Sequence, residues 1–295
     1  MKKGIIYFIP FLLALGIFAI FPLVKIIILS LQEGYDFFSG SYDSIGFDNF
    51  YEVLSSRIFL SAIINTVVYS ISSVLLSLII SIFLANILSK NSLINRFLQT
   101  AFFMPLVTSS VAVCLVWRFM FNESFGIINY FITLCGFDPI QWFSTTKYEL
   151  ILLILYGTWD LIPITLLLML SAFQSINKNI VISAKLDTAS EMKIFWRVKL
   201  PLVGKMILTV SILNFISCIK VFDALFPLFN GRPGTMYDLY TIVYYVYYQM
   251  FERQNYGVAA AASILAILII VLIIIIFRLC SFLYHKYGGN QSAHN

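Results

Sequence analysis

The chain has 295 residues, of which 60% are hydrophobic and only 11% are charged, and its formal net charge at pH 7 is +5. About a quarter of the residues of an ordinary soluble domain are charged, so this composition excludes that class and indicates a polytopic membrane protein. The small positive balance is typical of membrane loop topology and does not indicate nucleic-acid binding.

Six apolar segments are long enough to cross a bilayer, which takes roughly 20 helical residues. Because lipid offers no hydrogen-bond partner to an open backbone, each segment is predicted to be a helix. In chain order they are Ile5–Leu31, Phe59–Leu88, Phe97–Phe121, Tyr148–Phe173, Leu202–Phe229 and Val258–Tyr284. We therefore expect an all-α membrane protein with six transmembrane helices. Residues 1–58 would form the first helix and an external loop, 59–286 the remaining transmembrane domain, and 287–295 a cytoplasmic tail.

The loop charges predict the side of the membrane that each loop faces. The loop after the first helix carries five acidic residues and a single basic residue, Arg57. Most other basic residues fall in alternate loops and at the chain ends: Lys2, Lys3, Lys90, Arg96, Lys178, Lys185, Lys193, Arg197, Lys199, Arg278 and Lys286. Since positively charged loops stay in the cytoplasm, the predicted orientation places both termini inside (N-in, C-in).

A polar segment at about residues 174–201 separates the fourth and fifth predicted helices. Its charged residues are Lys178, Lys185, Asp187, Glu191, Lys193, Arg197 and Lys199. A segment with this charge density lies outside the bilayer, and it is expected to form two short helical pieces. Pro201 is expected to open the next long helix, where a missing backbone N–H costs little. Such a segment between two spans indicates a docking surface for a cytoplasmic partner.

Charge inside a membrane span is costly, so a charged residue there is a functional candidate by default. Lys25 and Lys205 lie near the ends of predicted spans and can extend to the surface, whereas Asp160, Lys220 and Asp223 are the functional candidates. Asp160 lies in the fourth helix, and a pore-facing or partner-facing position is favoured because a lipid-facing carboxylate is unfavourable. Lys220 and Asp223 lie three residues apart in the fifth helix and are expected to share one face. They are interpreted either as lining a pathway or as a stabilising pair near the outer surface, and both readings stay open.

No motif of an enzyme is present. ATP hydrolysis needs a glycine-rich phosphate loop that ends in Lys and Ser or Thr, and the nearest candidate, Gly204-Lys205-Met206, lacks the upstream glycine and the hydroxyl. The four cysteines are scattered and the two histidines fall in the tail, so no metal site is expected. We predict a protein without catalytic residues, metal or cofactor of its own.

An ordered pattern runs through the polar segment. It starts with Ile182-Ser183-Ala184-Lys185-Leu186-Asp187-Thr188-Ala189, continues through Arg197, and ends with Val198-Lys199-Leu200-Pro201. Shorter pieces that fit the same family lie at Asn65-Thr66, Trp117, Phe121-Asn122, Gly126 to Asn129, Trp159, Phe222-Asp223 and Gly231 to Gly234.

This pattern and the six-helix layout resemble the permease subunits of binding-protein-dependent ABC importers. The closest group is the sugar-type family that serves maltose, multiple-sugar and glycerol-3-phosphate uptake. Its cytoplasmic loop is built from E-A-A, D-G-A and I-x-L-P elements, and the spacing from Asp187 to Pro201 is preserved. Ile182, Ser183 and Thr188 replace the motif's glutamate, first alanine and glycine.

The resemblance implies half of a translocation pathway for a sugar, in a multi-pass protein of the bacterial cytoplasmic membrane. A neutral saccharide is favoured, because the first external loop is acidic and aromatic. The implied partners are a second homologous permease subunit, an ATP-binding cassette ATPase dimer that uses the ATP, an extracytoplasmic solute-binding protein and membrane lipid. The residues implied to couple to the ATPase are Ser183, Ala184, Asp187, Thr188, Ala189 and Pro201.

Two other classes of function stay open. An ion-coupled secondary transporter would bind its coupling ion at Asp160 or Asp223, and such proteins usually contain inverted repeats. A membrane scaffold would keep the polar docking segment but would not need charged residues inside its spans.

Overall fold

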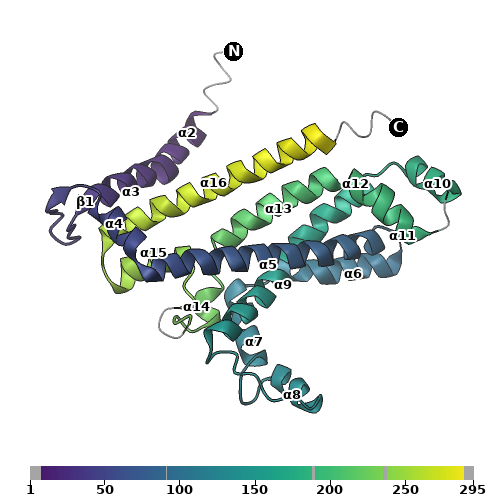
Figure 1. Ribbon diagram of the computed structural model, residues 1–295, viewed down its shortest axis with the longest axis horizontal. Coiled ribbons are helices and arrows are strands. Elements are labelled where there is room, and N and C mark those ends of the chain that lie inside the picture. Colours follow the sequence, from purple (N-terminus) through teal and green to yellow (C-terminus); the bar gives the residue numbers. More distant parts are fainter. Residues whose placement is uncertain (1–7, 91, 188–189, 235–237, 289–295) are drawn as a thin grey trace. The chain divides into compact units, whose positions relative to one another are not determined.

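The computed structural model describes residues 8–90, 92–187, 190–234 and 238–288, and helices dominate these ranges (Figure 1). Contacts divide the chain into two units. The first takes in residues up to Ile63 together with Tyr240–Ile273, and the second takes in Ile64–Leu239 and the residues from Ile274 onward. Lys2 and Lys3, which support the predicted orientation, lie outside the described residues, as does the predicted 287–295 tail from residue 289 onward.

The first unit begins with one long apolar helix that contains a π-helical turn. Its parts are α2 (Ile9–Leu15), η1 (Gly16–Ile20) and α3 (Phe21–Leu31). Pro22 carries no backbone N–H and so cannot donate to the carbonyl four residues back, while Phe21 N–H donates to Gly16 O five residues back. The wide turn therefore lies where proline interrupts the regular hydrogen-bond ladder.

A short hairpin and the chain's tyrosine-rich helix complete the first unit. Strands β1 (Gln32–Glu33) and β2 (Ser44–Ile45) pair antiparallel, with Gln32 opposite Ile45. The other elements are α4 (Asp48–Ser55), the first turns of α5 (Arg57–Leu88), α15 (Ile242–Tyr247), η5 (Tyr248–Glu252) and most of α16 (Tyr256–Gly288). Tyr244 and Tyr245 are fully buried, and the Tyr245 ring packs on Phe59.

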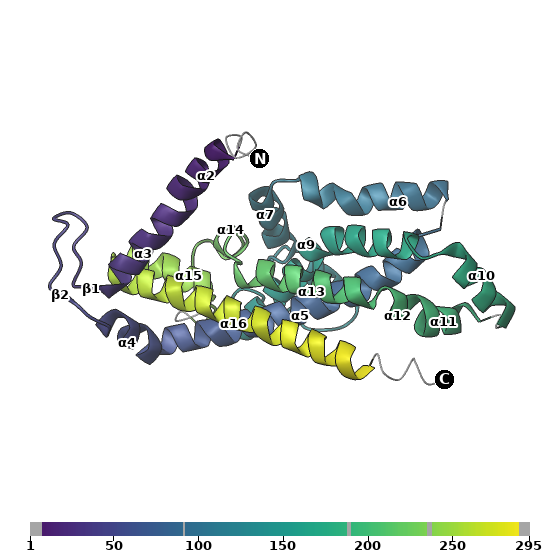
Figure 2. The same ribbon diagram turned by 90° about the horizontal axis from the view of Figure 1, so that it is seen from above.

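The second unit contains the remaining helices. They are the rest of α5, then α6 (Leu93–Phe103), η2 (Met104–Val107), α7 (Ser110–Met120), α8 (Ile127–Leu134), α9 (Thr146–Gln174), α10 (Lys178–Asp187), α11 (Glu191–Ile194), η3 (Phe195–Lys199), α12 (Leu200–Leu202), α13 (Gly204–Ile219), α14 (Leu225–Leu228) and the end of α16. Helix α9 is central, with α6 packed on one side and α13 on the other (Figure 2).

Small residues hold α5 close to α9. One face of α5 carries four fully buried serines, Ser70, Ser73, Ser77 and Ser81. Gly157 of α9 lies so close to the Tyr69 ring that an added Cβ would overlap it. Small side chains allow membrane helices to approach closely, and polar groups between them form hydrogen bonds. On the other side of α9, Asn214 Nδ2 of α13 donates to Thr165 Oγ1 at 2.7 Å.

The prediction of six membrane-spanning helices is confirmed in part. Four helices are long and apolar enough to cross a bilayer, within Ile9–Leu31, Arg57–Leu88, Thr146–Gln174 and Tyr256–Ile276. Two bent pairs raise the number to six if each pair is one span: Leu93–Val107 with Ser110–Met120, and Glu191–Leu202 with Gly204–Ile219. Side and direction of insertion are untested by the fold, so N-in/C-in stays a prediction.

Two of the predicted spans are wrong as continuous helices. The predicted helix Phe97–Phe121 is bent by 104° between η2 and α7, where Pro105 lies in a 3₁₀ turn. The predicted helix Leu202–Phe229 contains a 66° bend at Val203, near its start, and the regular helix that follows ends at Ile219. Pro201 therefore lies in the three-residue α12, and the long helix starts at Gly204.

Candidate functional site

A cavity of about 250 Å³ lies in the second unit where α5, α7, α9 and the end of α13 meet. Its lining residues are Tyr69, Ser110, Tyr156, Asp160, Leu161, Ser217, Cys218, Lys220, Val221, Phe222, Asp223 and Ala224. All three charged residues that the sequence singles out as pathway candidates, Asp160, Lys220 and Asp223, line this one cavity.

The end of α13 gives the cavity its irregular wall. The helix stops at Ile219, Lys220 is its C-cap, and Asp223 follows in a non-helical stretch. The expectation that Lys220 and Asp223 share a helix face is therefore wrong, since the helix ends before both can lie on it. The turn brings them to the same cavity nevertheless. A cation suits this position, because the last carbonyls of a helix carry partial negative charge.

The charged residues that line the cavity are exposed and do not pair with one another. Asp160, Lys220 and Asp223 are all exposed, and among the described residues Lys220 forms no ion pair within 4 Å of either carboxylate. The phenols of Tyr69 and Tyr156 are buried in the wall beside them. The cavity thus combines two carboxylate acceptors and one ammonium donor that form no ion pair with one another, beside the hydroxyl groups of Tyr69, Tyr156 and Ser110.

An aromatic cluster lies behind Asp160. Trp117 stacks on Phe121, meets Tyr156 edge-on with ring centroids 5.5 Å apart, and lies 5.8 Å from Trp159. Pockets that bind small molecules are typically lined by aromatic and apolar groups around a few placed polar groups. Sequence reasoning missed Tyr69, Ser110 and Tyr156 as cavity residues, because nothing in their spacing marks them; the nearby Trp117 and Trp159 appeared only as family-like pieces.

The predicted docking segment is divided between an exposed helix and a buried anchor. Ser183, Ala184 and Asp187 lie on α10, in which no residue is buried. Thr188 and Ala189 lie outside the described residues. The large apolar side chains Ile182 and Leu186 are exposed, and Leu186 reaches 85%.

The anchor is the following helical piece. Ile194 and Phe195 are buried, and the Phe195 ring stacks on Phe83 of α5 and on Phe173 of α9. Lys185 of α10 and Glu191 of α11 form an ion pair of 2.8 Å across the gap between the two pieces. The two short helical pieces expected from the sequence are present, and the second ties the segment to the transmembrane core.

In the described part of the chain, no three His, Cys, Asp or Glu side chains come together as metal ligands. The residues around the cavity offer hydrogen-bonding groups, charge and aromatic faces, which suit the binding of a polar solute. Long apolar helices around a polar cavity, together with a helix that ends inside its span, define a membrane transport protein.

Comparison with known proteins identifies which kind. The family model of the binding-protein-dependent transport system inner membrane component matches residues 77–286. The chain belongs to this family. It is accordingly a multi-pass membrane permease component rather than an enzyme.

Named relatives and a solved structure agree with this assignment. The trehalose/maltose transport system permease protein MalF of Thermococcus litoralis is 26% identical over 259 residues, covering 88% of this chain and 86% of the relative. The arabinooligosaccharides transport system permease protein AraP of Bacillus subtilis is 26% identical over 255 residues, covering 85% and 80%. A chain of a bacterial alginate ABC transporter, solved in complex with an alginate pentasaccharide-bound periplasmic protein, has the same fold with a TM-score of 0.80 at 24% identity, covering 94% of this chain and 93% of that one.

Proposed function

We propose that this chain is one of two similar permease subunits that together form the translocation pathway of a sugar importer in a bacterial cytoplasmic membrane. Relatives named for trehalose/maltose and for arabinooligosaccharides support a saccharide as the substrate. The periplasmic protein in the alginate transporter complex supports an extracytoplasmic solute-binding protein that delivers it. A neutral saccharide is the preferred substrate within this class.

The cavity formed by Asp160, Lys220 and Asp223 is the observation that carries this proposal. A saccharide hydroxyl both donates and accepts hydrogen bonds, so a site for it needs acceptors and donors together. The two carboxylates accept, the Lys220 ammonium donates, and neighbouring tyrosine and serine hydroxyls can do either. The aromatic cluster of Trp117 and Trp159 offers apolar ring faces to the sugar's C–H groups.

Coupling to ATP is proposed to run through the segment from Ile182 to Pro201. An exposed helix with apolar contacts fits a groove on a partner protein, and α10 presents Ile182 and Leu186 in this way. Phe195 locks the following piece against α5 and α9, so a displacement of α10 would reach the core as a rigid movement. A separate ATPase dimer would supply the energy, and the predicted N-in/C-in orientation would put α10 on the same side of the membrane as this ATPase.

Uptake by the reconstituted assembly tests the pathway. The chain, its partner subunits and the binding protein are placed in vesicles with ATP inside, and uptake of a labelled neutral oligosaccharide is measured. Asp160→Asn, which keeps the size and removes the charge, should lower uptake about tenfold or more, as expected when an intramembrane ionisable group is functional. Unchanged uptake in this variant contradicts the cavity assignment. Loss of uptake with a protonophore, but not on ATP depletion, favours an ion-coupled carrier instead.

Co-purification tests the coupling segment. Leu186→Glu puts a charge on the apolar face of α10 and should lower the amount of ATPase recovered with the chain about tenfold. Because the side chain is exposed, stability should change by no more than about 0.5 kcal/mol. Leu134→Glu, an exposed leucine of α8, is the matched control and should leave ATPase recovery unchanged. Equal recovery from both variants means that α10 does not dock the ATPase.

A further inference from the structure

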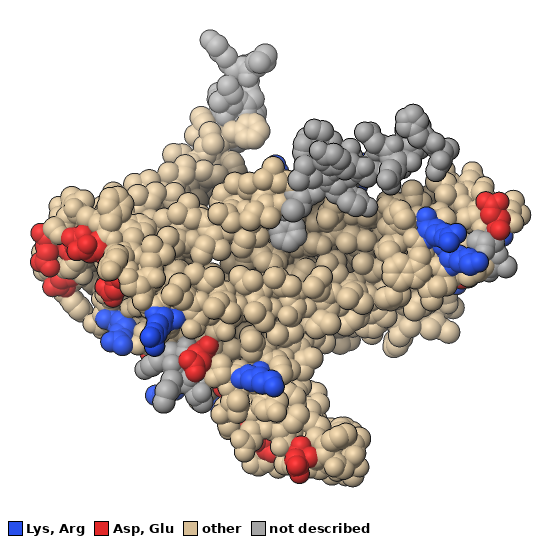
Figure 3. Space-filling view, in the orientation of Figure 1, with Lys and Arg blue, Asp and Glu red and all other residues tan. Residues whose placement is uncertain are grey.

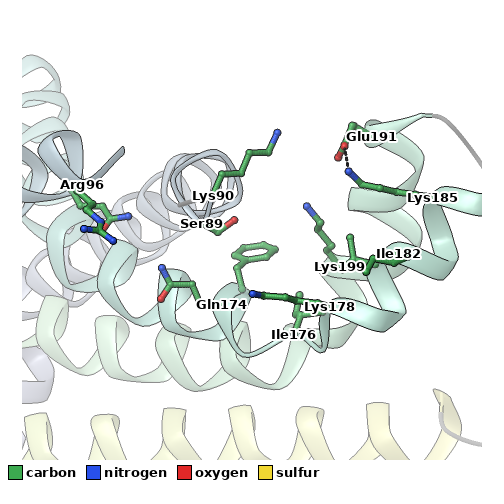
Figure 4. A pocket seen from close by; sticks show the side chains of 13 residues that line it. Ser89, Lys90, Arg96, Gln174, Ile176, Lys178, Ile182, Lys185, Glu191 and Lys199 are labelled. Atoms are coloured by element: carbon green, nitrogen blue, oxygen red, sulfur yellow. Dashed lines mark ion pairs between the residues drawn. The ribbon is translucent and has the colours of Figure 1, made fainter. Parts of the chain in front are cut away.

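The cavity lined by Asp160, Lys220 and Asp223 is called the transport cavity below. A second and larger cavity lies beside α10 and shares no lining residue with it. Its volume is about 740 Å³, and it is formed by the ends of α5 and α9, the start of α6, and α10, α11 and η3 (Figure 4). We call it the basic groove. Its lining residues are Ser89, Lys90, Arg96, Gln99, Phe173, Gln174, Ile176, Lys178, Val181, Ile182, Lys185, Glu191 and Lys199.

Positive charge dominates the basic groove. Five lining side chains are cationic and a single one, Glu191, is anionic. Glu191 is already engaged by Lys185 at 2.8 Å, and Figure 4 shows this pair at the edge of the opening towards which Lys90 and Lys199 extend. Among the described residues, Lys90 and Lys178 form no ion pair within 4 Å, and Lys199 Nζ donates to the neutral amide oxygen of Asn86 at 3.0 Å, so the lining keeps an excess of positive charge. A site with this excess attracts an anion that can accept several hydrogen bonds.

The rest of the groove is apolar and continues onto a helix surface. Phe173, Ile176 and Ile182 form part of the lining. On α6, which begins at the groove, Leu93, Ile94 and Phe97 are at least 70% exposed. Lys and Arg near the end of an apolar helix extend their charge towards the polar headgroup layer while the helix contacts the acyl chains.

We propose that the basic groove binds the phosphate of an anionic membrane phospholipid, with the acyl chains lying along the exposed face of α6. Helix α6 contributes Arg96 to the groove and carries the exposed apolar residues Leu93, Ile94 and Phe97 on the same first turns, so the two halves of one lipid molecule can contact one helix end. An acidic protein segment would neutralise the cations but would not cover the exposed apolar residues of α6. The site rests on the proposed function only in that it assumes that this end of the helices lies at a membrane surface.

Lipid retention by the full chain tests the proposal. Purified protein in mild detergent is offered phosphatidylglycerol or phosphatidylcholine, and bound lipid is counted by native mass spectrometry. The wild type should retain phosphatidylglycerol preferentially. Lys90→Gln with Lys178→Gln should weaken that retention about tenfold or more, since each basic side chain near an anionic headgroup contributes appreciably. Lys147→Gln, an exposed lysine at the start of α9, is the control and should change nothing.

A variant with the opposite sign sharpens the test. Glu191→Gln removes the groove's only lining carboxylate and releases Lys185, so phosphatidylglycerol retention should increase. Equal retention of both lipids by the wild type overturns the proposal. Retention that the double variant does not alter also overturns it, because the lipid then binds elsewhere.

Two further measurements distinguish a bound lipid from a free anion and from a docked protein. Binding of inorganic phosphate without a preference for phosphatidylglycerol assigns the groove to a free anion and overturns the lipid proposal. Loss of the co-purifying ATPase in the double variant, with lipid retention unchanged, assigns the groove to protein docking and also overturns it. Failure of sugar uptake would contradict the proposed function but would leave the lipid measurement unaffected, so the two can fail separately.

Discussion

The acidic hairpin of the first unit and the basic groove of the second differ in what their charged side chains contact. Figure 3 shows carboxylates gathered over the β1–β2 hairpin and basic side chains gathered around α10 and α11. In the hairpin, Glu33 accepts from the Ser44 hydroxyl and from Asp48 N–H, and Asp36 accepts from Phe38 N–H at 2.8 Å. In the groove, most cations face an open cavity.

The difference shows that charge has two uses outside a membrane. Glu33 and Asp36 hold their own loop in shape, because backbone N–H groups and serine hydroxyls nearby donate hydrogen bonds to their carboxylates. The lining of the groove keeps an excess of positive charge, which an anionic ligand can neutralise. A count of charges per loop predicts topology in both cases, but the contacts decide which surface is available for a ligand.

Of the changes considered, removal of the anchor of the docking segment should reduce the stability of the chain most. Phe195→Ala deletes a buried ring that stacks on Phe83 and Phe173, and it should cost about 3–5 kcal/mol of stability. Thermal unfolding of the purified full chain in detergent measures the loss. Leu186→Ala, on the exposed face of α10, should be nearly neutral. A small loss in Phe195→Ala would mean that the groove does not depend on this anchor.

The base of the hairpin should give a smaller effect. Asn49 is buried, and its Nδ2 donates to Ser30 O at 3.0 Å and to Gln32 O at 2.9 Å. Asn49→Ala leaves two carbonyls without this donor and should cost about 1–3 kcal/mol, measured by the same unfolding experiment. Ser39→Ala, in the exposed part of the loop, is the control and should change stability little. Equal effects of the two variants would show that the hairpin is held by other contacts.

Acid should give the smallest effect on the hairpin. The hydrogen bond from Ser44, followed by that from Asp48 N–H, lowers the pKa of Glu33 below its ordinary value of 4.5. Because the folded-state pKa is lowered, the stabilisation is complete above the ordinary value and is lost as the pH falls through the lowered one. Protection of the Asp48 amide in hydrogen exchange should therefore be greater at about pH 6 than at about pH 3. Glu33→Gln should remove this dependence, and a dependence that survives would assign it to another group.

Much of the fold follows from hydrophobic length and from the cost of charge in lipid. Four of the six predicted spans are helices at nearly the predicted positions, and the polar segment forms short helices. The bend at Val203 and the end of α13 at Ile219 were not predictable in detail, because apolar residues flank Val203 and resume at Ala224 after the charged residues Lys220 and Asp223. Pro105 marks the other bend, but proline is also common in unbroken membrane helices, as Pro163 within α9 shows.

The candidate site was predictable in its charged residues and not in its walls. The high cost of intramembrane charge is a strong signal, so Asp160, Lys220 and Asp223 could be selected from the sequence alone. That they line one cavity depends on where α13 stops, which their spacing does not reveal. Tyr69 and Tyr156 enter the cavity because Gly157 lets α5 approach α9, and such an approach leaves little trace in one sequence.

The early end of α13 means that one wall of the transport cavity is shaped by main-chain hydrogen bonds. Lys220 N–H donates to Ser217 O at 3.2 Å and Val221 N–H donates to Cys218 O at 3.1 Å, where the chain leaves the helix. These bonds cannot be titrated, and they do not depend on which side chains the turn carries. The chain can therefore exchange cavity side chains for different solutes while the turn at the end of α13 keeps its form.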